Sequence, residues 1–540
     1  MLARGNMAEM RKKVRETCDD ASVLDIQSHG AEGSLEGNSD ASVWRSIVTW
    51  GVVVFSFALA YGQFPLYKGN YNTYLLHGFA LAGRGQLAHD WLARTLDPFP
   101  VFSALIAMPA ALDWRWFFYV GHGVLLGVYL YAAVHIVKGV SGERRPTSTP
   151  LLACVIALPQ VWAGRDAVSY AFSGDWGWCL QAGVAGQYIV GHMFQPSLFG
   201  VLCVASLAAF ANRRDGIALV VAAAAVLMHF SYLITVLGLI SGYSLTRWRE
   251  MRDARAALRY FACGLILCVT VSLPTLRFLP TDAGTSAEAA RVLTDVRLPH
   301  HALPERWLSH PCLLWVQCPL VVGGAIVAWR TRLRWAFSML LALGGGLLVT
   351  QILTDSRQLA LLFPWRVSAT LVPVAFSLVA GALSRRLWAR RTSRYAVAFG
   401  VAVAILAAGH GYSHTLDELE AYDQDPSVAL LSAASKMATP ETLFVIPTNM
   451  ERFRLETGAP VFVDYKAHPY EDVEVIEWDE RLSLAKELDA EDPLQACAAA
   501  TRLHERYRAT HFVRPTDSRL VCANLGTVFE DANFLIQRWM

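Results

Sequence analysis

Residues 330–386 read RTRLRWAFSMLLALGGGLLVTQILTDSRQLALLFPWRVSATLVPVAFSLVAGALSRR. Two apolar segments, 335–353 and 367–384, have arginine-rich turns at their far ends and a polar loop, Thr354–Arg366, between them. Each segment is long enough to cross a bilayer, which takes roughly 17–25 mostly apolar residues. Because cytoplasmic loops of membrane proteins hold the excess of Lys and Arg, the turns predict a cytoplasmic side and the polar loop an extracytoplasmic side.

The same alternation extends along the chain. Arginine-rich turns alternate with polar loops that contain Asp, His, Trp and Gln. The turns are Gly142–Pro146, Asn212–Asp215, Arg247–Arg255, Arg330–Arg334 and Arg385–Arg394, and the loops are Tyr61–Pro98, Arg165–Tyr188, Arg277–His310 and Thr354–Arg366. Of 540 residues 54% are apolar, and the mean hydropathy of +0.33 is unusual for a soluble chain of this length. We therefore expect an α-helical polytopic membrane protein with its chemistry outside.

We expect about eleven spans. Single spans are predicted at 44–62, 117–139, 150–164, 188–211, 257–279, 311–329, 335–353, 367–384 and 394–411, and 216–246 reads as a hairpin that breaks at Met228–Tyr232. The apolar stretch 99–112 is short, and a crossing there would move every later arginine turn outside. We expect it to be re-entrant or to lie flat at the outer interface, which places the N-terminus inside and the C-terminus outside.

Three domains follow from the composition. We expect residues 1–43 to form a disordered cytoplasmic tail. Residues 44–411 are predicted to form a transmembrane domain with a large first outer loop at 62–116, and residues 412–540 an extracytoplasmic α/β domain. In the last domain strands are predicted at 443–447, 460–464 and 511–514, and helices at 427–437, 477–489 and 493–508. Cys497 and Cys522 could pair in an oxidising compartment or remain two buried thiols. The net charge of +2 gives no reason to expect a nucleic-acid partner.

Several motifs carry a family resemblance. They are Asn70-Tyr71-Asn72-Thr73-Tyr74-Leu75-Leu76-His77, Asp90-Trp91-Leu92, Asp97-Pro98, Arg297-Leu298-Pro299-His300-His301 and the run from Phe453-Arg454 through Asp464-Tyr465-Lys466 and Pro469-Tyr470 to Glu477-Trp478. With them the chain resembles an uncharacterised branch of the bacterial GT-C superfamily of membrane glycosyltransferases. The resemblance implies a multi-pass protein of the bacterial cytoplasmic (inner) membrane, a catalytic acidic residue in the first outer loop, and a soluble outer C-terminal domain.

The resemblance also implies the substrates. The donor would be a sugar on a polyprenyl phosphate, and the acceptor an envelope glycan, lipid or protein. Asp90 is our first candidate for the base that takes the acceptor proton in an inverting transfer, and Asp97 the second. The usual Asp-Glu or Asp-x-Asp pair is absent, because Asp90 lies between His89 and Trp91, so a divalent metal stays open. Asp90 could instead cap the helix that begins at Trp91, and Asp97-Pro98 could start a turn.

The leaving phosphate is anionic and needs cationic or hydrogen-bonding partners. The candidates are His89, Arg94, Arg297, His300, His301, Arg357 and Arg366. Arg366 could also anchor a span at the interface, and Arg357 could pair with Asp355. Adjacent histidines in an extended segment point to opposite sides, so we expect at most one of His300 and His301 to face a ligand; loop packing and metal ligation are the alternatives.

Polar residues predicted at membrane depth are further candidates, because polar groups are costly there. His192, Gln195, His229 and Tyr232 would face a cavity or bond a neighbouring helix, and Pro196 would break its span. In the C-terminal domain Asp464, Lys466, Glu477, Trp478 and Arg481 could serve the fold or acceptor recognition.

The favoured function is a glycosyltransferase that uses a polyprenyl-phosphate sugar. One alternative is a non-enzymatic transporter or assembly factor for lipid-linked glycans, and another is a glycan ligase or polymerase. Transporters usually contain internal repeats, and the sequence has no evident repeat. A ligase should gather its polar residues in a late loop, whereas here they concentrate in the first.

Overall fold

The computed structural model describes residues 36–142, 148–280, 282–388 and 394–540. By internal contacts the chain divides into two compact units, 1–52 and 53–540. Most of the tail predicted at 1–43 lies outside the described residues, and so do most of the turn Gly142–Pro146 and much of the turn Arg385–Arg394. Residues expected to form separate transmembrane and C-terminal domains belong to the same unit, 53–540.

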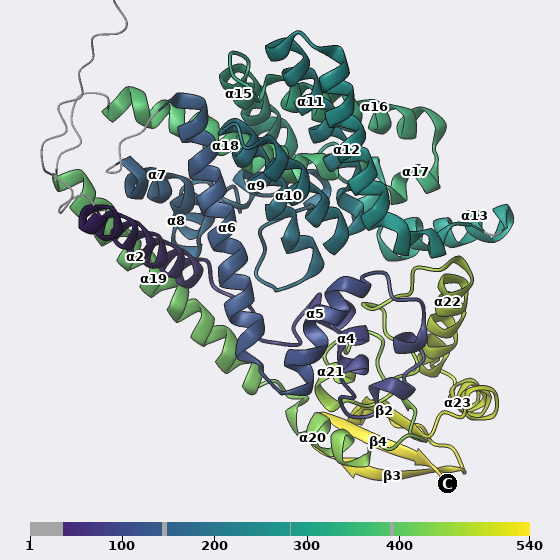
Figure 1. The fold of residues 1–540 in the computed structure, drawn as a ribbon. Coiled ribbons are helices and arrows are strands. Elements are labelled where there is room, and N and C mark those ends of the chain that lie inside the picture. The colour runs from purple at the N-terminus through teal and green to yellow at the C-terminus, as the bar shows by residue number, and fades with distance from the viewer. Residues whose placement is uncertain (1–35, 143–147, 281, 389–393) are drawn as a thin grey trace, which may run out of the picture. The chain divides into compact units, whose positions relative to one another are not determined.

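The described part of unit 53–540 is mostly helical, with one small sheet near the C-terminus (Figure 1). Its longer helices before the sheet are α5 (Pro100–Ala111), α6 (Trp116–Ser141), α7 (Ser148–Ala157), α8 (Trp162–Phe172), α9 (Val201–Ala211), α10 (Asp215–Met228), α11 (Leu233–Met251), α12 (Ala254–Ser272), α15 (Cys318–Ala328), α16 (Arg334–Thr354), α18 (Val367–Trp388) and α19 (Arg394–Asp423). Helix α2 (Glu36–Tyr61) begins in the first unit and ends in the second.

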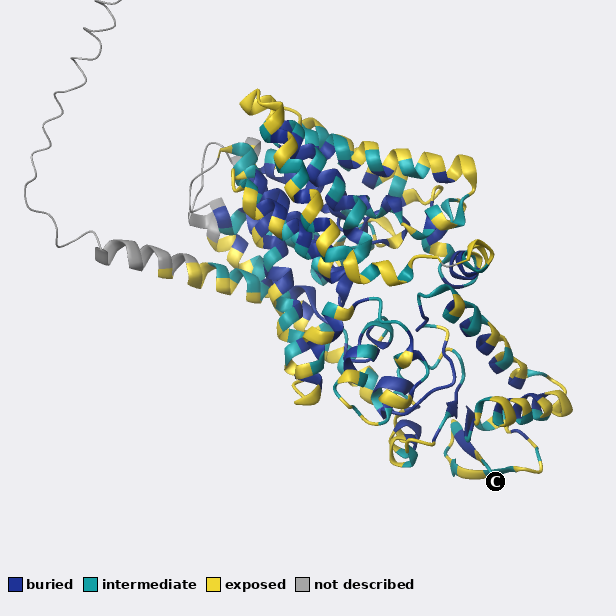
Figure 2. Cartoon of the chain, turned by 45° about the vertical axis from the view of Figure 1, so that its right-hand side comes forward, coloured by how far each residue is buried: buried dark blue, intermediate teal, exposed yellow. Residues whose placement is uncertain are grey.

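Four helical stretches in the described residues are long and apolar enough to cross a membrane: Trp116–Ser141, Ala254–Phe278, Arg334–Thr354 and Arg357–Arg385. A fifth arises if Thr149–Gln160 and Trp162–Phe172, which meet at a bend of 55°, form one span. The remaining apolar helices are shorter, so the eleven predicted spans exceed this number. Many apolar side chains on these helices are exposed, as on α12 and α16, and exposed positions run along the outside of the helical part (Figure 2).

Proline and histidine break two of the predicted spans. The break predicted at Pro196 inside the span 188–211 is confirmed, because Gln195 is extended and the helix begins only at Pro196. Proline favours the first helical position, where its missing N–H is not needed. The predicted break in the hairpin is confirmed: α10 ends at Met228, and the His229 side chain accepts a hydrogen bond from the Ser231 N–H before α11 begins at Leu233.

Helix α5 is the short apolar stretch that follows Pro98. Its 12 residues rise about 18 Å, less than the roughly 30 Å of a hydrocarbon core. Met108 and Leu112 are exposed on it, while Phe102 and Ile106 are buried. This length agrees with the expectation that the stretch does not cross the bilayer.

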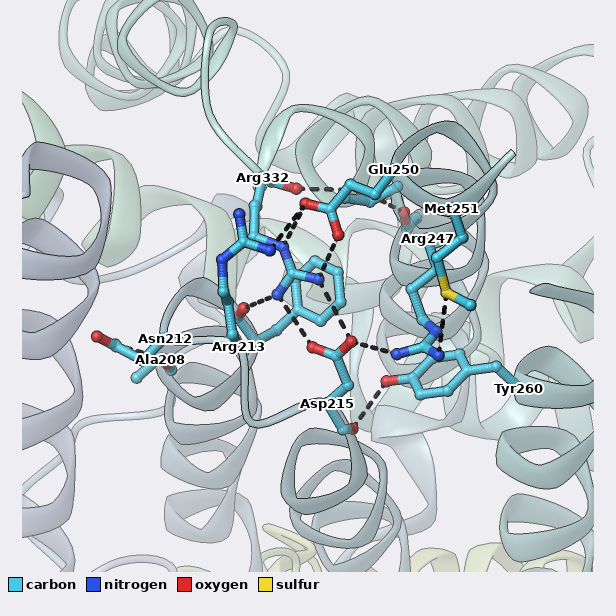
Figure 3. A network of polar contacts seen from close by, with 12 residues as sticks. Ala208, Asn212, Arg213, Asp215, Arg247, Glu250, Met251, Tyr260 and Arg332 are labelled. Carbon is cyan, nitrogen blue, oxygen red and sulfur yellow. Dashed lines mark hydrogen bonds and ion pairs between the residues drawn. The ribbon is translucent and has the colours of Figure 1, made fainter. Parts of the chain in front are cut away.

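A polar network joins three of the arginine-rich turns (Figure 3). Asp215 accepts hydrogen bonds from Arg247 and Arg332, and Arg332 also donates to Glu250 through Nε at 2.8 Å. The Tyr260 hydroxyl donates to the Asp215 carbonyl at 2.9 Å. Ends of α10, α11, α12 and α15 are thereby held together at the end of the bundle where the turns lie.

The C-terminal part has a four-stranded sheet in the order β1-β2-β4-β3. The strands are β1 (Phe444–Val445), β2 (His511–Pro515), β3 (Leu525–Glu530) and β4 (Phe534–Trp539), and the helices are α20 (Val428–Met437), α21 (Phe453–Thr457), α22 (Asp472–Lys486) and α23 (Pro493–Tyr507). β1 pairs with β2 in parallel and the other pairs are antiparallel. The predicted strand at 460–464 is reduced to one bridge between Val461 and Phe444, and β3 and β4 were not predicted. Helix α19 continues to Asp423, past the expected domain boundary at 412.

Candidate functional site

Asp90 lies in a fully buried cluster of charges. Its Oδ1 accepts hydrogen bonds from the backbone N–H groups of Leu92 at 2.9 Å and Ala93 at 3.3 Å. Its Oδ2 accepts one from Arg454 Nε at 2.9 Å and one from the Val461 N–H at 2.8 Å. Arg454 also forms an ion pair with Asp464. The negative charges of Asp90 and Asp464 raise the pKa of the Arg454 guanidinium.

Asp90 therefore acts as a backbone cap and an anchor for the first loop against the C-terminal part. Its exposed fraction is 0%, and both of its oxygens already accept two hydrogen bonds. The capping interpretation describes what the side chain does in the structure, where neither carboxylate oxygen is exposed. Asp90 is accordingly absent from the site described next.

Arg366 is the first member of a cationic cluster, which we call the arginine site. It is the last residue of the 3₁₀ turn Pro364–Arg366, directly before α18. Its Nε donates to Gln187 Oε1 at 2.8 Å, and its Nη1 contacts the Ser231 hydroxyl and lies 3.3 Å from His229 Nε2. All three partners are neutral hydrogen-bonding groups, and no carboxylate of the described residues forms an ion pair with Arg366.

Arg297 is the second member and comes from the third loop. Its Nη2 donates to the Lys466 carbonyl at 2.6 Å, and its guanidinium lies 5.3 Å from the centre of the Tyr465 ring. Only 8% of Arg297 is exposed, and its Nε is buried without a hydrogen-bond partner. Among the described residues it too has no carboxylate in ion-pair range. The Lys466 ammonium group nearby has a lowered pKa, because burial opposes its charge.

Two tyrosines lie close to both arginines. Tyr74 lies in helix α3 (Tyr71–Tyr74) of the first loop, and Tyr470 in the segment before α22; their hydroxyls contact each other. Burial raises the pKa of both phenols, and Arg366 and Arg297 both act on each of them in the opposite direction. Phe99 closes this side of the site, 4.8 Å from His229 and 5.7 Å from Tyr470 between ring centres.

Three histidines line the same region. His300 and His301 lie in a short helix, α14 (Pro299–Ala302), with their rings 4.0 Å apart; the expectation that they point to opposite sides of an extended segment is wrong. His301 Nδ1 donates to the Ala185 carbonyl at 2.6 Å, and burial lowers its pKa to about 3. Burial also lowers the pKa of His300 and of His468, and Arg297 adds to the effect on both. Burial thus disfavours the charged form of all three side chains.

The backbone of the site departs from regular geometry. Ala185 and Phe363 have left-handed conformations, with φ of 57° and 47°, which are uncommon for residues other than glycine and costly for bulky ones. Residues Val292–Arg297 and Leu313–Gln317 form π-helical turns, which occur frequently at functional sites. The unusual backbone thus belongs to the loops that position His301, Arg297 and Arg366.

An apolar groove of about 770 Å³ ends beside the arginine site. It lies between α15, α16 and α18 and is lined along its length by Val321, Val322, Ile326, Leu341, Leu348, Leu371 and Val372, with Gly344 and Gly345 on α16. At one end lie Val184 and Trp365, next in sequence to Ala185 and Arg366. A buried apolar cluster that includes Ala185, Ala302 and Trp365 connects this end to α14.

The other predicted site residues lie in varied places. Tyr232 is buried, with the Arg366 guanidinium 5.8 Å from its ring centre, and Gln195 donates to the Tyr188 hydroxyl at 3.2 Å.

Arg357 pairs with Asp295 at 3.1 Å and with Asp355, which confirms the pairing with Asp355. His89 and Arg94 contact each other at 3.2 Å, away from Arg297 and Arg366. His192 lies between aromatic rings and 3.0 Å from Arg165.

Asp97 is half-buried at the edge of the site. Its Oδ1 accepts a hydrogen bond from the Phe99 N–H at 2.8 Å, so it shapes the turn that places Phe99 against His229. The neighbouring Leu96 N–H donates to Glu474 at 3.1 Å. Among the described residues, no group of three or more His, Cys, Asp or Glu side chains is placed to hold a metal ion.

Two disulfides lie on the loop side of the protein. Cys497 pairs with Cys522 within the C-terminal part, and Cys179 of the second loop pairs with Cys312 at the end of the third. The second pair was not predicted, because its members are 133 residues apart. Gln317, five residues after Cys312, donates to the carbonyls of Ala182 and Gly183, so the two loops are joined at the groove's end.

Residues 427–485 match a family described as a domain of unknown function, DUF6798. The matched segment contains Arg454, Asp464, Lys466, His468 and Tyr470, and thus the C-terminal contribution to both the buried charge cluster and the arginine site. No curated protein matches the chain.

Tyr74, Tyr188, His468 and Tyr470 were not predicted as site residues, although the quoted motifs include Tyr74 and Tyr470. Lys466 was considered only for folding or acceptor recognition. These residues come from parts of the chain almost 400 positions apart. Local spacing could not predict that residues so far apart in the sequence lie in one site. The one available signal for such a site was the recurrence of Tyr beside Asn, His and Lys in those motifs.

Proposed function

We propose that the protein binds the phosphate group of a membrane lipid that carries a sugar, at the extracytoplasmic surface of the bacterial inner membrane, and transfers the sugar to an acceptor. The observation that carries the proposal is the pair Arg297 and Arg366 near the end of an apolar groove, where no carboxylate of the described residues forms an ion pair with either arginine. A GT-C-like glycosyltransferase with a polyprenyl-linked donor fits this arrangement.

The charge of Arg297 supports an anionic ligand. A buried charge is costly unless it is paired and hydrogen-bonded. The equally buried Arg454, Arg481 and Arg514 each have a carboxylate within 3.0 Å. Arg297 has instead one carbonyl acceptor and an unpartnered Nε. A phosphate would supply the missing negative charge and accept hydrogen bonds from both arginines.

The groove supports a lipid as the carrier of that phosphate. Its middle is lined by aliphatic side chains and glycines, and a hydrocarbon chain placed there would bury apolar surface at roughly 25 cal/mol per Å². The polar members of the lining are Gln317, Ser368 and Arg330.

Both disulfides support an extracytoplasmic position for the loops. Disulfides persist in oxidising compartments and are rare in the cytosol. Cys179–Cys312 and Cys497–Cys522 both lie away from the arginine-rich turns that Figure 3 shows joined by Asp215 and Arg332. With the turns inside, the loops, the arginine site and the C-terminal sheet all lie outside, and eleven spans remain our proposal for the topology.

We assign the role of base in the transfer to the carboxylate of Asp97. It would take the proton of the acceptor hydroxyl while the acceptor oxygen bonds to the sugar's anomeric carbon and the bond to the lipid phosphate breaks, leaving the phosphate anionic at the arginines. Asp97 is only half-buried and lies two residues before Phe99. A positioned base of this kind contributes about 10²–10⁴-fold.

The test separates binding from transfer. Purified full-length protein is assayed for binding of an isoprenyl phosphate and for transfer from a radiolabelled polyprenyl-phosphate sugar. Asp97→Asn should keep binding and lose transfer by about 100-fold or more, whereas Asp355→Asn, a control at an exposed acid, should keep both. Full transfer by Asp97→Asn would remove Asp97 as the base, and failure of the wild-type protein to bind the lipid would overturn the proposal.

The second candidate is a lipid-linked-glycan binding or assembly factor without catalysis. The observation that favours it is the complete use of Asp90 in the buried charge cluster, since the acid that the resemblance singles out is committed to folding. The same assay decides between the two: the factor binds the lipid-linked sugar but yields no transfer product with any acceptor supplied.

A further inference from the structure

The arginine site contains two separate centres of positive charge. Arg366 is fixed from the α10–α11 break and the second loop, through Ser231, His229 and Gln187. Arg297 is fixed from the C-terminal part, through the Lys466 carbonyl and the Tyr465 ring. In the part of the chain that the structure describes, the two arginines have different hydrogen-bonding partners. The two sets of partners meet at Phe99, which lies 4.8 Å from His229 and 5.7 Å from Tyr470 between ring centres. Both arginines oppose the rise of the pKa that burial causes in Tyr74 and Tyr470.

Lys466 differs from these arginines in its pKa. Burial lowers the pKa of the Lys466 ammonium group, and Glu451 and Asp464 act in the opposite direction. Burial also lowers the pKa of His300, His301 and His468. What remains is one positive charge on each of the two arginines, without an acid in ion-pair range among the described residues.

We propose that the headgroup bound here is a lipid diphosphate, with one phosphoryl group at Arg297 and the other at Arg366. This inference rests on the proposed function and narrows its donor. A phosphodiester carries one negative charge at neutral pH. A sugar linked through a monophosphate would leave one arginine uncompensated, whereas a diphosphate link balances both.

Hydrogen-bond donors agree with the charge count. Arg297 Nε is buried and unpartnered. Gln195 Oε1, beside Tyr188, is another buried atom without a partner and could accept from a sugar hydroxyl. Arginine holds phosphate through paired N–H donors, so each guanidinium suits one phosphoryl group.

The experiment compares two probes that differ by one phosphoryl group. Farnesyl phosphate and farnesyl diphosphate are titrated against purified full-length protein in detergent, with inorganic pyrophosphate as a third arm. Farnesyl phosphate is a monoester with nearly two negative charges at neutral pH, so this pair of probes tests the number of phosphoryl groups and not the charge alone. The diphosphate should bind at least about tenfold more tightly than the monophosphate, a difference of about 1.4 kcal/mol, because only the diphosphate places one phosphoryl group at each arginine. Inorganic pyrophosphate should bind far more weakly than farnesyl diphosphate, because it places nothing in the groove.

Single neutral variants locate the two phosphoryl groups. Arg297→Gln and Arg366→Gln should each lower affinity for the diphosphate by about tenfold or more and bring it near that for the monophosphate. Arg357→Gln is the control, because Arg357 is already paired with Asp295 and Asp355, and its affinities should match the wild type.

Each contrary outcome has a distinct meaning. Equal binding of both farnesyl probes overturns the diphosphate assignment and leaves the proposed function in place. Pyrophosphate binding as tight as farnesyl diphosphate assigns the site to a free diphosphate and overturns the lipid. Absence of binding by any probe overturns the proposed function itself.

Discussion

Asp90, Arg454 and Asp464 show what a buried charge cluster does in this protein at the scale of single residues. Two carboxylates and one guanidinium would be costly in the interior by themselves. The excess negative charge is held by backbone N–H groups of Leu92, Ala93, Val461 and Ala467. The cluster thus fastens the first loop to the C-terminal part, and it is a structural element on which the arginine site depends.

Removing the Asp90 charge should therefore destabilise the fold. Asp90→Asn leaves Arg454 with one carboxylate, and breaking such a buried pair costs about 3–5 kcal/mol. We expect a large drop in melting temperature and poor accumulation of the purified protein. Asp97→Asn on the same loop, with a half-buried side chain, should melt close to the wild type. An Asp90→Asn protein that melts normally but has lost transfer would instead return Asp90 to the reaction.

Glu474 gives the docking of the first loop a dependence on pH. Burial raises the pKa of its carboxyl to about 7 from the ordinary 4.5, and Glu471 and Glu477 add to the rise. A folded-state pKa above that of the unfolded chain means that the folded protein binds the extra proton. Its contribution to stability is full below about pH 4.5 and is lost as the pH rises through about 7.

Melting temperatures at pH 5 and pH 8 test this dependence. Glu474→Gln should remove part of the fall in stability between the two values, so the variant should gain on the wild type at pH 8. Glu480→Gln is a suitable control, because Glu480 lies on the same helix and is more than half exposed. Parallel curves for the wild type and Glu474→Gln would show that the carboxyl titrates normally.

At the scale of elements, the sequence predicted helices and breaks well where one local signal sufficed. A proline marked the start of α5, and the sequence Met228–Tyr232 marked the break between α10 and α11. Apolar length predicted the bounds of α16, and those of α23 were predicted nearly to the residue. Strand β4 has the pattern FLIQRW and β3 the pattern LGTVFE, short runs near the chain's end whose pairing depends on β2. The arginine site could be predicted only in part: Arg297, His300, His301 and Arg366 were candidates, whereas Tyr470 and His468 enter through the folding of the C-terminal part.

Helix α16 offers a direct test of the groove. Gly345 lines the groove, and a Cβ added there would meet no atom within 4 Å; the same holds for Gly346, which does not line it. Gly345→Leu should fill the groove without disturbing the fold and lower affinity for farnesyl diphosphate by about tenfold. Gly346→Leu should leave affinity unchanged. Equal affinities for the two variants would exclude this groove as the lipid site.

At the scale of the whole molecule, the protein has two chemically different ends. Arg332 and Arg247 with Asp215 join the turns at one end (Figure 3). The other end carries the disulfides, the arginine site and the C-terminal sheet. Helix α10 connects them, since it begins at Asp215 and ends just before His229. This polarity agrees with the excess of Arg and Lys in cytoplasmic loops, and it makes the proposed orientation testable at the two ends of one helix.

Helix α12 begins near an arginine-rich turn, and the chain that leaves its far end leads into the third loop and helix α13 (Ala283–Arg291). Ala254 and Ala287, one on each side, are both exposed. In a background whose free cysteines are replaced by serine, Ala287→Cys should react with a membrane-impermeant maleimide in spheroplasts. Ala254→Cys should react only after the membrane is permeabilised. Labelling of Ala254→Cys in intact spheroplasts would place the arginine-rich turns outside, and the arginine site, the disulfides and the proposed donor would then have to be assigned to the cytoplasmic face.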